Sequence, residues 1–436
     1  MCVCVILYSK ILFNSLIYLY NYISVCVCVC NIYIMSAIAT EGKVITCKAA
    51  VQFERKGELQ IVDVQVAPPK RLEVRIKIIG SGVCHTDYSE PLYASQQFPV
   101  ILGHEGGGIV ESIGEGVTSV KVGDHVIPLY IPECRNEYEN EPNYGFCCYC
   151  TKKNFAKTNL CGVIRGPQGK GVMPDGTSRF STMDGKVVHH FMGCSTFSQY
   201  TVCPEISVAV VPKEAPLDKI GLLGCGITTG YGAVMNTIKV EPDTIGAVWG
   251  LGGVGLAVIM GLKEAGCRKI VAIDINETKF PMAKDFGATD FVNPKTVEGG
   301  DLGAYLNKLC GGYPGAGPDY TFEAIGNTTT MRQALEYCHK GWGKSCIIGV
   351  APEGKEIATR SFQMVIGKEW HGTAFGGTRG RTQLGGYVQK YLDGKLKVDE
   401  FVTFTFPLKD INEAFHKLHS GEALRSVILL HDGANM

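Results

Sequence analysis

The chain has 436 residues, of which 45% are hydrophobic and 19% charged, enough apolar material for the cores of two globular domains. Lysine plus arginine equals aspartate plus glutamate, 42 each, so net charge gives no reason to expect a nucleic acid as a partner. Nineteen cysteines in a large chain without a clear signal peptide favour metal binding where they cluster. Single ones such as Cys310 and Cys338 are interpreted as small buried hydrophobic residues.

Residues 1–34 are almost entirely apolar or aromatic, and three interpretations compete. A signal anchor lacks a basic leader region and a clear cleavage site, and a transmembrane helix would be interrupted by Asn14, Ser15 and Asn21. Alternating Cys and Val at 25–30 is what a simple dinucleotide repeat encodes, so the third interpretation is translated non-coding sequence. We favour the third, exclude residues 1–34 from the fold, and expect a cytoplasmic protein without a membrane segment.

The pattern of residues 44–130 is β-rich. Apolar residues alternate with charged neighbours at Leu72, Val74, Ile76 and Ile78. This alternation predicts a half-buried strand. Residues 132–161 are polar and rich in cysteine with little periodicity, which predicts a loop.

From about residue 227 the pattern changes to alternating strands and helices. We predict strands at 245–250, 269–274, 290–294, 319–326 and 345–350. Helices are predicted at 255–266, where Gly266 is a suitable C-terminal cap, and at 282–288. This alternation favours a parallel sheet built from βαβ units. The tail beyond residue 375 is predicted to contain one amphipathic helix, 411–421, and a final strand, 426–432.

A dinucleotide-binding motif lies in this second region. Gly250, Gly252 and Gly255 form GxGxxG, with Val254 inside it, between a predicted strand and a predicted helix. Asp274 follows at the end of the next strand, and the full context is specific. The glycines permit a tight turn, close approach of a pyrophosphate and close packing, while the Asp274 carboxylate binds ribose hydroxyls and repels a 2′-phosphate. NAD is therefore favoured over NADP; the alternative is a glycine-rich turn with a capping aspartate.

Two groups of soft metal ligands stand out. The first is Cys84, His104 and Cys225, three side chains that suit zinc and leave a fourth position open for chemistry. Sequence spacing alone does not join these segments, and an isolated Cys–His pair is more often core packing. The second group consists of Cys134, Cys147, Cys150 and Cys161. Four thiolates would close a structural zinc site, whereas the alternative is a set of free or disulfide-linked loop cysteines.

The chain resembles the zinc-containing medium-chain alcohol dehydrogenases in GHEGGGIVESIGEGV, CHTD, the four-cysteine loop and GLGGVG. LLGCGITTGYGA, QGKGVMPDGTSRF, HKGWG and GTAFGG are most similar to the class III branch, which oxidises S-(hydroxymethyl)glutathione and reduces S-nitrosoglutathione. The resemblance implies an α/β fold with a GroES-like, β-rich catalytic domain and a Rossmann domain with a doubly wound parallel sheet. The expected boundaries are 35–226 for the catalytic domain, 227–374 for the NAD-binding domain, and 375–436 for a return to the catalytic domain.

The same resemblance implies roles for individual residues. Cys84, His104 and Cys225 would hold a catalytic zinc beside Glu105, with Asp87 behind His104 and Thr86 in the proton relay. The coenzyme would contact His85, Thr229, Lys279 and Arg425 in addition to the glycine motif and Asp274. Substrate would contact Tyr130, Arg165 and Lys340, the last two through glutathione carboxylates. The family also suggests two zinc ions and one NAD per subunit, a small-molecule substrate and a homodimer.

Three departures from the family pattern bear on these roles. The segments between Cys134 and Cys147 and between Cys150 and Cys161 are longer than usual, although loop length costs entropy only slowly. The loop after CHTD is shorter and lacks the acidic residues expected near the amino end of glutathione, and Gly162 replaces a glutamine. Two alternatives therefore stand beside the class III activity: a zinc dehydrogenase of ordinary primary alcohols, and a non-catalytic scaffold protein.

Overall fold

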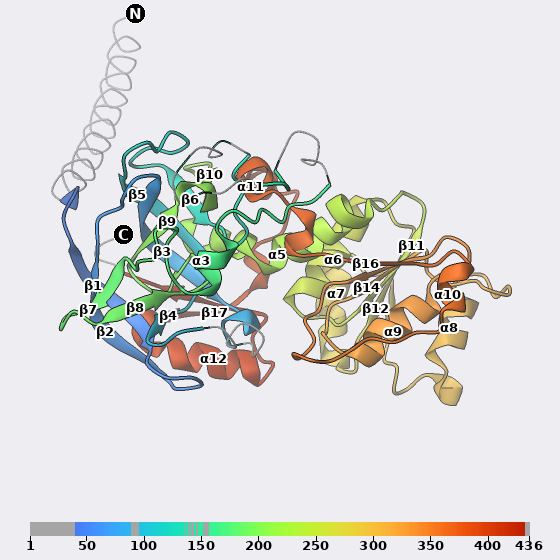
Figure 1. Ribbon diagram of the computed structural model, residues 1–436. Coiled ribbons are helices and arrows are strands. Elements are labelled where there is room, and N and C mark those ends of the chain that lie inside the picture. The colour runs from blue at the N-terminus through green and yellow to red at the C-terminus, as the bar shows by residue number, and fades with distance from the viewer. Residues whose placement is uncertain are drawn as a thin grey trace, which may run out of the picture.

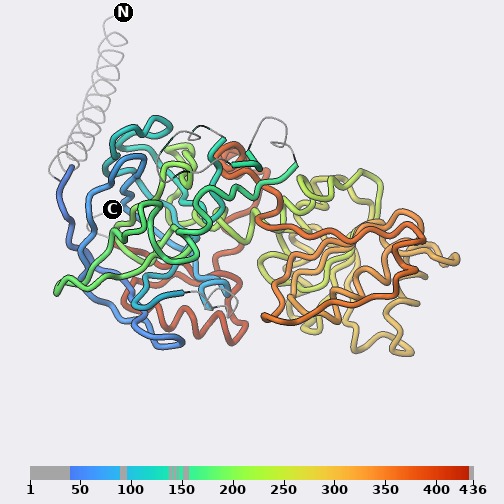
Figure 2. Tube along the Cα trace, in the orientation of Figure 1, coloured from blue at the N-terminus to red at the C-terminus, as the bar shows by residue number. Residues whose placement is uncertain are grey.

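The computed structural model describes residues 40–88, 96–135, 137, 141, 144, 147–150 and 157–431; the interpretation of residues 1–34 lies outside them. Two β-sheet regions lie side by side, one formed by the first half of the chain together with its last strands, the other by residues 245–372 (Figures 1 and 2). Among the described residues, no helix has the length and apolar character needed to cross a membrane. The predicted combination of a β-rich region and a parallel αβ region is confirmed.

The first region consists of a small barrel and a larger, mostly antiparallel sheet. The barrel strands, in spatial order, are β1 (Ile45–Gln52), β2 (Leu59–Val66), β7 (Phe180–Thr182), β8 (Val187–His190) and β4 (Val100–Ile101). The larger sheet has the order β10 (Val208–Val211), β6 (His125–Pro128), β5 (Glu105–Ile113), β3 (Glu73–Val83), β18 (Arg425–Leu429) and β17 (Val402–Pro407), with β9 (Tyr200–Pro204) also paired to β3. Strand β3 lies inside this sheet. Because β3 and β5 are antiparallel, the segment that follows β3 and the segment that precedes β5 lie at the same end of the two strands.

The expectation that the strand around residue 76 is half-buried is wrong. Strand β3 is buried on both faces: Glu73 and Arg75 are as inaccessible as its apolar residues, and only Lys77 is half-buried. Each has an ionic partner: Arg75 Nε lies 2.5 Å from Glu111 Oε2, and Glu73 Oε1 lies 2.5 Å from Arg179 Nη2. Because paired charges can be buried where unpaired ones cannot, the alternation of polar and apolar residues misleads here.

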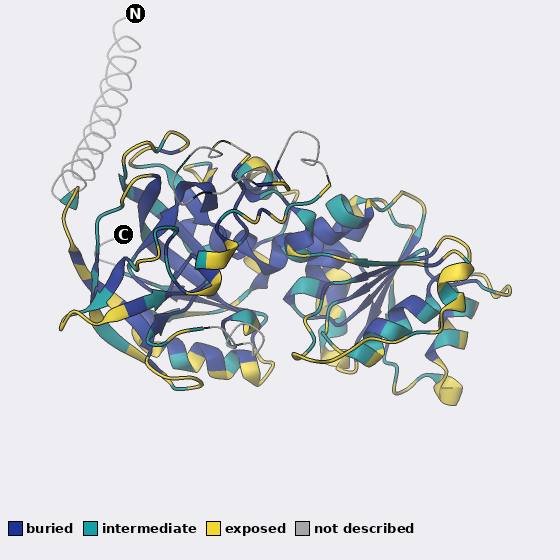
Figure 3. Ribbon diagram, viewed as in Figure 1, coloured by how far each residue is buried: buried dark blue, intermediate teal, exposed yellow. Residues whose placement is uncertain are grey.

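The second region is a six-stranded parallel sheet with the order β13-β12-β11-β14-β15-β16, the doubly wound arrangement of dinucleotide-binding folds. Its strands are β11 (Ile245–Trp249), β12 (Lys269–Ile273), β13 (Asp290–Val292), β14 (Tyr320–Glu323), β15 (Lys344–Ile347) and β16 (Glu369–Gly372). The helices in this region are α6 (Gly253–Glu264), α7 (Phe280–Phe286), α8 (Leu302–Leu309), α9 (Thr328–Tyr337) and α10 (Phe362–Val365). Figure 3 shows buried strands between helices whose outer faces are exposed.

The tail contains more structure than the sequence predicted. The expected helix and strand are present as α12 (Ile411–His419) and β18, but helix α11 (Gly380–Leu392) and strand β17 were missed. Helix α11 contains three glycines and several polar residues, which obscure the apolar period expected of a helix. Strand β18 pairs antiparallel with β3, so the end of the chain returns to the first region.

One hydrophobic cluster spans both regions, since Ile127 and Leu223 of the first pack in the same cluster as Val258 and Phe322 of the second. The connecting helices are α4 (Leu217–Ile220) and α5 (Gly226–Gly232), and α5 packs closely on α6. The carboxyl ends of β11 and β12 and the carboxyl end of β3 are thereby brought to the junction, where the candidate site lies.

Candidate active site and metal centres

Cys84, His104 and Cys225 are far apart in sequence but meet at the junction. Cys84 follows β3, His104 precedes β5, and Cys225 stands at the start of α5. Their ligand atoms, together with a carboxylate oxygen of Glu105, all lie within 4.8 Å of one another, and all four side chains are buried. His104 Nε2 lies 3.2 Å from Cys225 Sγ. Two sulfurs and one imidazole nitrogen, with a carboxylate beside them, fit a catalytic zinc site.

Asp87 fixes the orientation of His104. Its Oδ1 lies 2.8 Å from His104 Nδ1 and accepts the Gly103 N–H, while its Oδ2 accepts the Cys84 N–H at 3.0 Å. With Nδ1 held by a carboxylate, Nε2 is the nitrogen left to face the sulfurs. Burial disfavours the imidazolium, but the charge and hydrogen bond of Asp87, together with Cys84, raise the pKa of His104 well above its usual value. A bound metal would take the place of that proton.

Glu105 and Arg425 form a buried pair next to the three ligands. Arg425 Nε lies 3.3 Å from Glu105 Oε2, and Arg425 Nη2 lies 4.0 Å from Cys84 Sγ. Among described residues, neither carboxylate oxygen of Glu105 accepts a hydrogen bond, an unsatisfied acceptor that suits a metal site. Burial raises the pKa of Glu105 to about 7 although the charge of Arg425 lowers it. A hydrogen bond with Cys225 and the charge of Arg425 lower the pKa of Cys84 well below its usual value, which favours the ligating thiolate.

An aromatic wall borders His104, and part of it was missed by the sequence analysis. The Tyr130 ring lies 5.8 Å from the His104 ring and 5.2 Å from the Phe375 ring, both edge-on, while Phe191 packs 6.1 Å from His104. Burial raises the pKa of Tyr130 well above its usual value, so its hydroxyl is neutral. Phe375 lies in the tail at φ 54°, a conformation that non-glycine residues seldom adopt. Phe375 directly precedes two glycines, and this was the feature of the sequence that could have indicated an unusual turn at this position.

Each glycine of the dinucleotide motif has a distinct environment. Gly250 has φ 95°, which a side chain would oppose, and a Cβ on Gly255 would lie 1.8 Å from the Gly250 carbonyl oxygen. A Cβ on Gly252 would meet nothing within 4 Å, so it would project into open space at the start of α6. A tight turn, an open approach and close helix–strand packing are the three requirements of a pyrophosphate-binding loop.

Residues around this loop come from both regions. Arg425 lies beside it, because a Cβ on Gly253 would be 3.1 Å from its Nη1. Asp274 directly follows β12, and its Oδ2 accepts the Leu251 N–H at 2.8 Å and lies 3.2 Å from Lys279 Nζ. The hydroxyl of Thr229, on α5, donates to the Cys225 carbonyl.

Four other predicted residues lie on loops and short turns. His85 and Thr86 occupy the short helix η1 (His85–Tyr88) directly after Cys84, with His85 exposed and Thr86 half-buried. Arg165 begins the short helix α3 (Arg165–Gly169) and donates from Nη1 to the Tyr130 carbonyl at 3.1 Å. Lys340 precedes β15, at the amino edge of the parallel sheet, whereas Gly250 follows β11 at the carboxyl edge. The structure therefore does not bring Lys340 to Arg165 within the chain.

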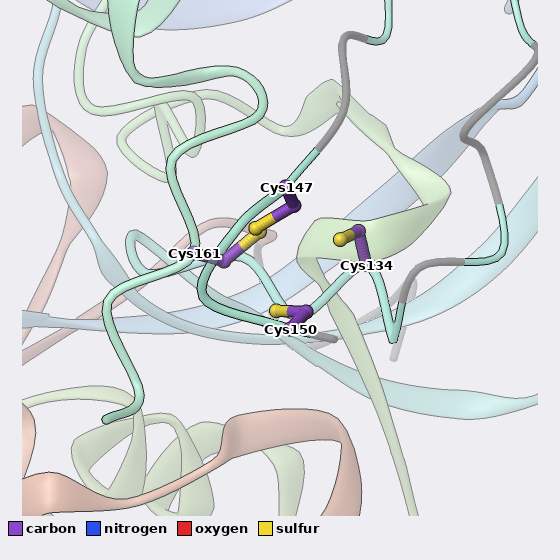
Figure 4. Close-up of side chains that lie close together, drawn as sticks. All are labelled: Cys134, Cys147, Cys150 and Cys161. Carbon is purple, nitrogen blue, oxygen red and sulfur yellow. The ribbon is translucent and has the colours of Figure 1, made fainter. Parts of the chain in front are cut away.

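The second cysteine group forms a compact, buried cluster (Figure 4). The ligand sulfurs of Cys134, Cys147, Cys150 and Cys161 lie within 4.8 Å of one another, and none forms a disulfide. The sulfurs of Cys147 and Cys161 are 3.7 Å apart. Zinc–sulfur bonds of about 2.3 Å in a tetrahedron place sulfurs ~3.8 Å apart, whereas a disulfide requires ~2.05 Å. The cluster thus fits zinc, and Cys148 is exposed outside it.

The lengthened segment before Cys147 is tied to the first region at two described points. Glu141 accepts from Arg71 through both oxygens, at 3.2 and 2.7 Å, and Tyr144 packs with Leu72 and Ile206 around the cysteines. The other residues added to this loop lie largely outside the described part of the chain. Cys134 joins the group despite the insertion, because the ends of a loop can meet at little extra entropic cost.

Family models match most of the chain. The model for the alcohol dehydrogenase GroES-like domain matches residues 70–213, and that for zinc-binding dehydrogenases matches residues 253–388. The chain is 58% identical to alcohol dehydrogenase class-3 of Dictyostelium discoideum, over 90% of this chain and 100% of that protein. It is 54% identical to S-(hydroxymethyl)glutathione dehydrogenase of Komagataella pastoris, with the same coverage. The crystal structure of benzyl alcohol dehydrogenase from Acinetobacter calcoaceticus superposes with a TM-score of 0.77 at 28% identity, over 89% of this chain and 100% of that one.

These matches and the two cysteine-containing centres define a zinc-dependent dehydrogenase that uses NAD as its coenzyme. Within that class, the chain belongs to the class III alcohol dehydrogenases, since full-length relatives of that class share more than half of its residues. The expectation of an enzyme is confirmed, and the alternative of a non-catalytic scaffold is not supported.

Proposed function

We propose that this enzyme transfers hydride from S-(hydroxymethyl)glutathione to NAD and also reduces S-nitrosoglutathione. The observation that carries the proposal is the meeting of Cys84, His104 and Cys225 with a dinucleotide-binding loop at one junction, while Arg165 stands on the aromatic wall beside them. Relatives at 54–56% identity are named S-(hydroxymethyl)glutathione dehydrogenases.

In this proposal, Cys84, His104 and Cys225 hold the catalytic zinc. When bound, that ion polarises the substrate oxygen and lowers the pKa of its hydroxyl. Asp87 keeps His104 in the ligating tautomer, and the Arg425 charge stabilises the Cys84 thiolate. Thr86 accepts the substrate proton and passes it outward through the ribose hydroxyls, which the half-buried position of Thr86 favours. Glu105 beside the ligands adds a carboxylate that is easily protonated.

The coenzyme is proposed to bind across the carboxyl edge of the parallel sheet. The first turn of α6, with Gly252 and Val254, and the side chains of Arg425 and His85 face the pyrophosphate. Asp274 and Lys279 bind the adenosine ribose, and Thr229 lies near the nicotinamide. The protein supplies the position of the ring, and the coenzyme supplies the redox chemistry.

The substrate site is proposed to recognise glutathione by its carboxylates. Arg165 anchors one carboxylate remote from the reacting carbon, and Tyr130 lines the path between them. Binding energy from such a distant group helps to orient the carbon that reacts. Residues 89–95 of the shortened loop lie outside the described residues, and Gly162 is exposed without a polar side chain. Lys340, at the opposite edge of the sheet, remains a predicted second carboxylate contact.

The competing function is oxidation of ordinary primary alcohols without glutathione. The experiment is NAD reduction with formaldehyde, with glutathione present or omitted, alongside a long-chain alcohol. We expect reduction with formaldehyde only when glutathione is present. Equal rates with and without glutathione would instead support the ordinary alcohol dehydrogenase.

A cytoplasmic homodimer is proposed as the assembly. Strand β16 is an edge of the parallel sheet, and an unpaired edge can continue into a second copy. The side chains of Phe362 and Val365, on nearby α10, are 67% and 73% exposed, which suits burial in an interface. Sedimentation equilibrium should give twice the chain mass, and a monomer at micromolar concentration would contradict the proposal.

A further inference from the structure

Gln168, on helix α3, uses its whole amide to join three elements of the substrate site. Its Nε2 donates to the carbonyls of Met192, at 3.2 Å, and Tyr130, at 3.5 Å, and its Oε1 accepts from Arg165 Nη1 at 3.4 Å. Because both donors face carbonyls, the amide oxygen must face the guanidinium. Gln168 is only 7% exposed, so water does not replace these contacts readily.

Arg165 is thereby held while its charge stays available. Nη1 is shared between the Gln168 oxygen and the Tyr130 carbonyl, both of them neutral acceptors. Among the described residues, no carboxylate forms an ion pair with Arg165, which is exposed. A guanidinium held by neutral groups can still bind an anion in the forked geometry that suits a carboxylate.

Tyr130 connects this arrangement to the reacting centre. Its carbonyl accepts from Arg165, whereas its ring lies edge-on 5.8 Å from the ring of His104. Tyr130 thus sets the spacing between the Arg165 guanidinium and the metal ligands. Gln168 forms hydrogen bonds with both Arg165 and the Tyr130 carbonyl.

We propose that Gln168 is a positioning residue that holds Arg165 as the anchor for a substrate carboxylate, and so determines the preference for substrates with a distant negative charge. The inference rests on the proposed function, in which Arg165 binds an anionic substrate. It adds a residue that touches no substrate but fixes the one that does.

A purely structural role is the competing explanation. Gln168 also supports the turn at Gly193, where φ is 70° and a Cβ would lie 2.8 Å from Gln168 Nε2. Loss of that support would impair folding or activity toward every substrate, whereas loss of positioning would affect only substrates with a carboxylate.

The test compares ω-hydroxylauric acid with lauryl alcohol, which lacks only the carboxylate. Steady-state kinetics are measured for the zinc-loaded enzyme and for Gln168→Met, Arg165→Ala and the double variant. We expect Gln168→Met to lower kcat/KM for the acid about tenfold, mainly through KM, while the alcohol changes less than about twofold. The double variant should match Arg165→Ala, because Gln168 acts through that residue.

Gln199→Met is the matched control. Gln199 also uses both ends of its amide, donating to the Leu430 carbonyl at 2.8 Å and accepting the Lys48 N–H at 3.0 Å, but it has no contact with Arg165. The acid-to-alcohol ratio of this variant should equal that of the wild type. Equal losses for both substrates in Gln168→Met, additive losses in the double variant, or no preference for the acid in the wild type would each overturn the proposal.

The same measurements separate this inference from the proposed substrate. If the wild-type enzyme prefers the acid but does not oxidise S-(hydroxymethyl)glutathione, the proposed function fails and the role of Gln168 stands. If the glutathione adduct is oxidised but Gln168→Met leaves its KM and the acid-to-alcohol ratio unchanged, only the role of Gln168 fails.

Discussion

Asp87 Oδ1 lies 2.8 Å from His104 Nδ1, with both side chains fully buried, and the other Asp87 oxygen accepts the backbone N–H of Cys84. One carboxylate therefore orients two of the three proposed ligands of the catalytic zinc. Burial raises the pKa of Asp87, so the ionised form depends on the positive charge that it faces.

Asp87→Asn should weaken zinc binding at this centre by about 10- to 100-fold, because the amide neither fixes the imidazole tautomer as well nor adds to its basicity. The measurement is retained activity and zinc content during competition with a chelator. Asp63→Asn, which alters only an exposed pair with Lys48, is the control. Zinc retention identical to the wild type would refute the orienting role of Asp87.

Asp274→Asn should relax the discrimination against NADP by at least about tenfold, because the charge that repels a 2′-phosphate is removed while the side-chain shape is kept. Lys279, freed of its 3.2 Å partner, would then attract the phosphate. The ratio of kcat/KM values for NAD and NADP is the measurement. Asp274→Ala also removes the acceptor of the Leu251 N–H, so it should weaken NAD binding further. An unchanged ratio in the Asn variant would count against ribose recognition by Asp274.

Cys147→Ser should remove one of two zinc ions per subunit and lower the thermal midpoint, because a closed structural zinc site contributes directly to folding. Cys148→Ser changes the neighbouring cysteine, which is exposed and outside the cluster, and should leave both quantities unchanged. Elemental analysis measures the zinc content per subunit, and thermal unfolding measures the midpoint. Two zinc ions per subunit in the Cys147 variant would mean that the cluster is not a zinc site.

The buried His190 should make the enzyme sensitive to acid. Burial and the charge of Arg179 lower the pKa of His190 to about 3, and its Nε2 accepts the Arg179 N–H at 3.1 Å. The unfolded chain binds this proton below about pH 6.5, whereas the folded one does not. Above about pH 6.5 His190 is neutral in both states and does not affect stability. As the pH falls from about 6.5 toward 3, the free energy of unfolding decreases by about 1.4 kcal/mol per pH unit.

His190→Gln should flatten this dependence, since an amide oxygen can accept the same N–H and does not titrate. Unfolding by denaturant at pH 7, 6 and 5 is the measurement, and the variant should lose less stability than the wild type below pH 6. Parallel curves for the two proteins would show that His190 does not set the acid sensitivity.

Local spacing determined much of this protein from its sequence. The glycine motif and Asp274 belong to one βαβ unit, the first of the strand–helix alternation from residue 245, so their relation follows from the chain itself. The metal-ligating residue types could also be named, because few side chains suit zinc. The helix α11 was missed, since three glycines and its polar residues obscure the apolar period on which helix prediction relies.

Tertiary structure alone decided which residues meet. Cys84, His104 and Cys225 come together because β3 and β5 pair and α5 starts beside them, and the partners of strands are not encoded in spacing along the chain. Pairing with Arg179 and Glu111 buried Glu73 and Arg75 of β3, which the alternation had placed in solvent. The parallel direction of β11 and β15 separated Lys340 from the coenzyme edge, and the fold of α3 against Tyr130 gave Arg165 its two neutral partners. Such contacts depend on long-range packing. The environment of each residue is set by neighbours that are distant along the chain, and their identity cannot be read from sequence spacing.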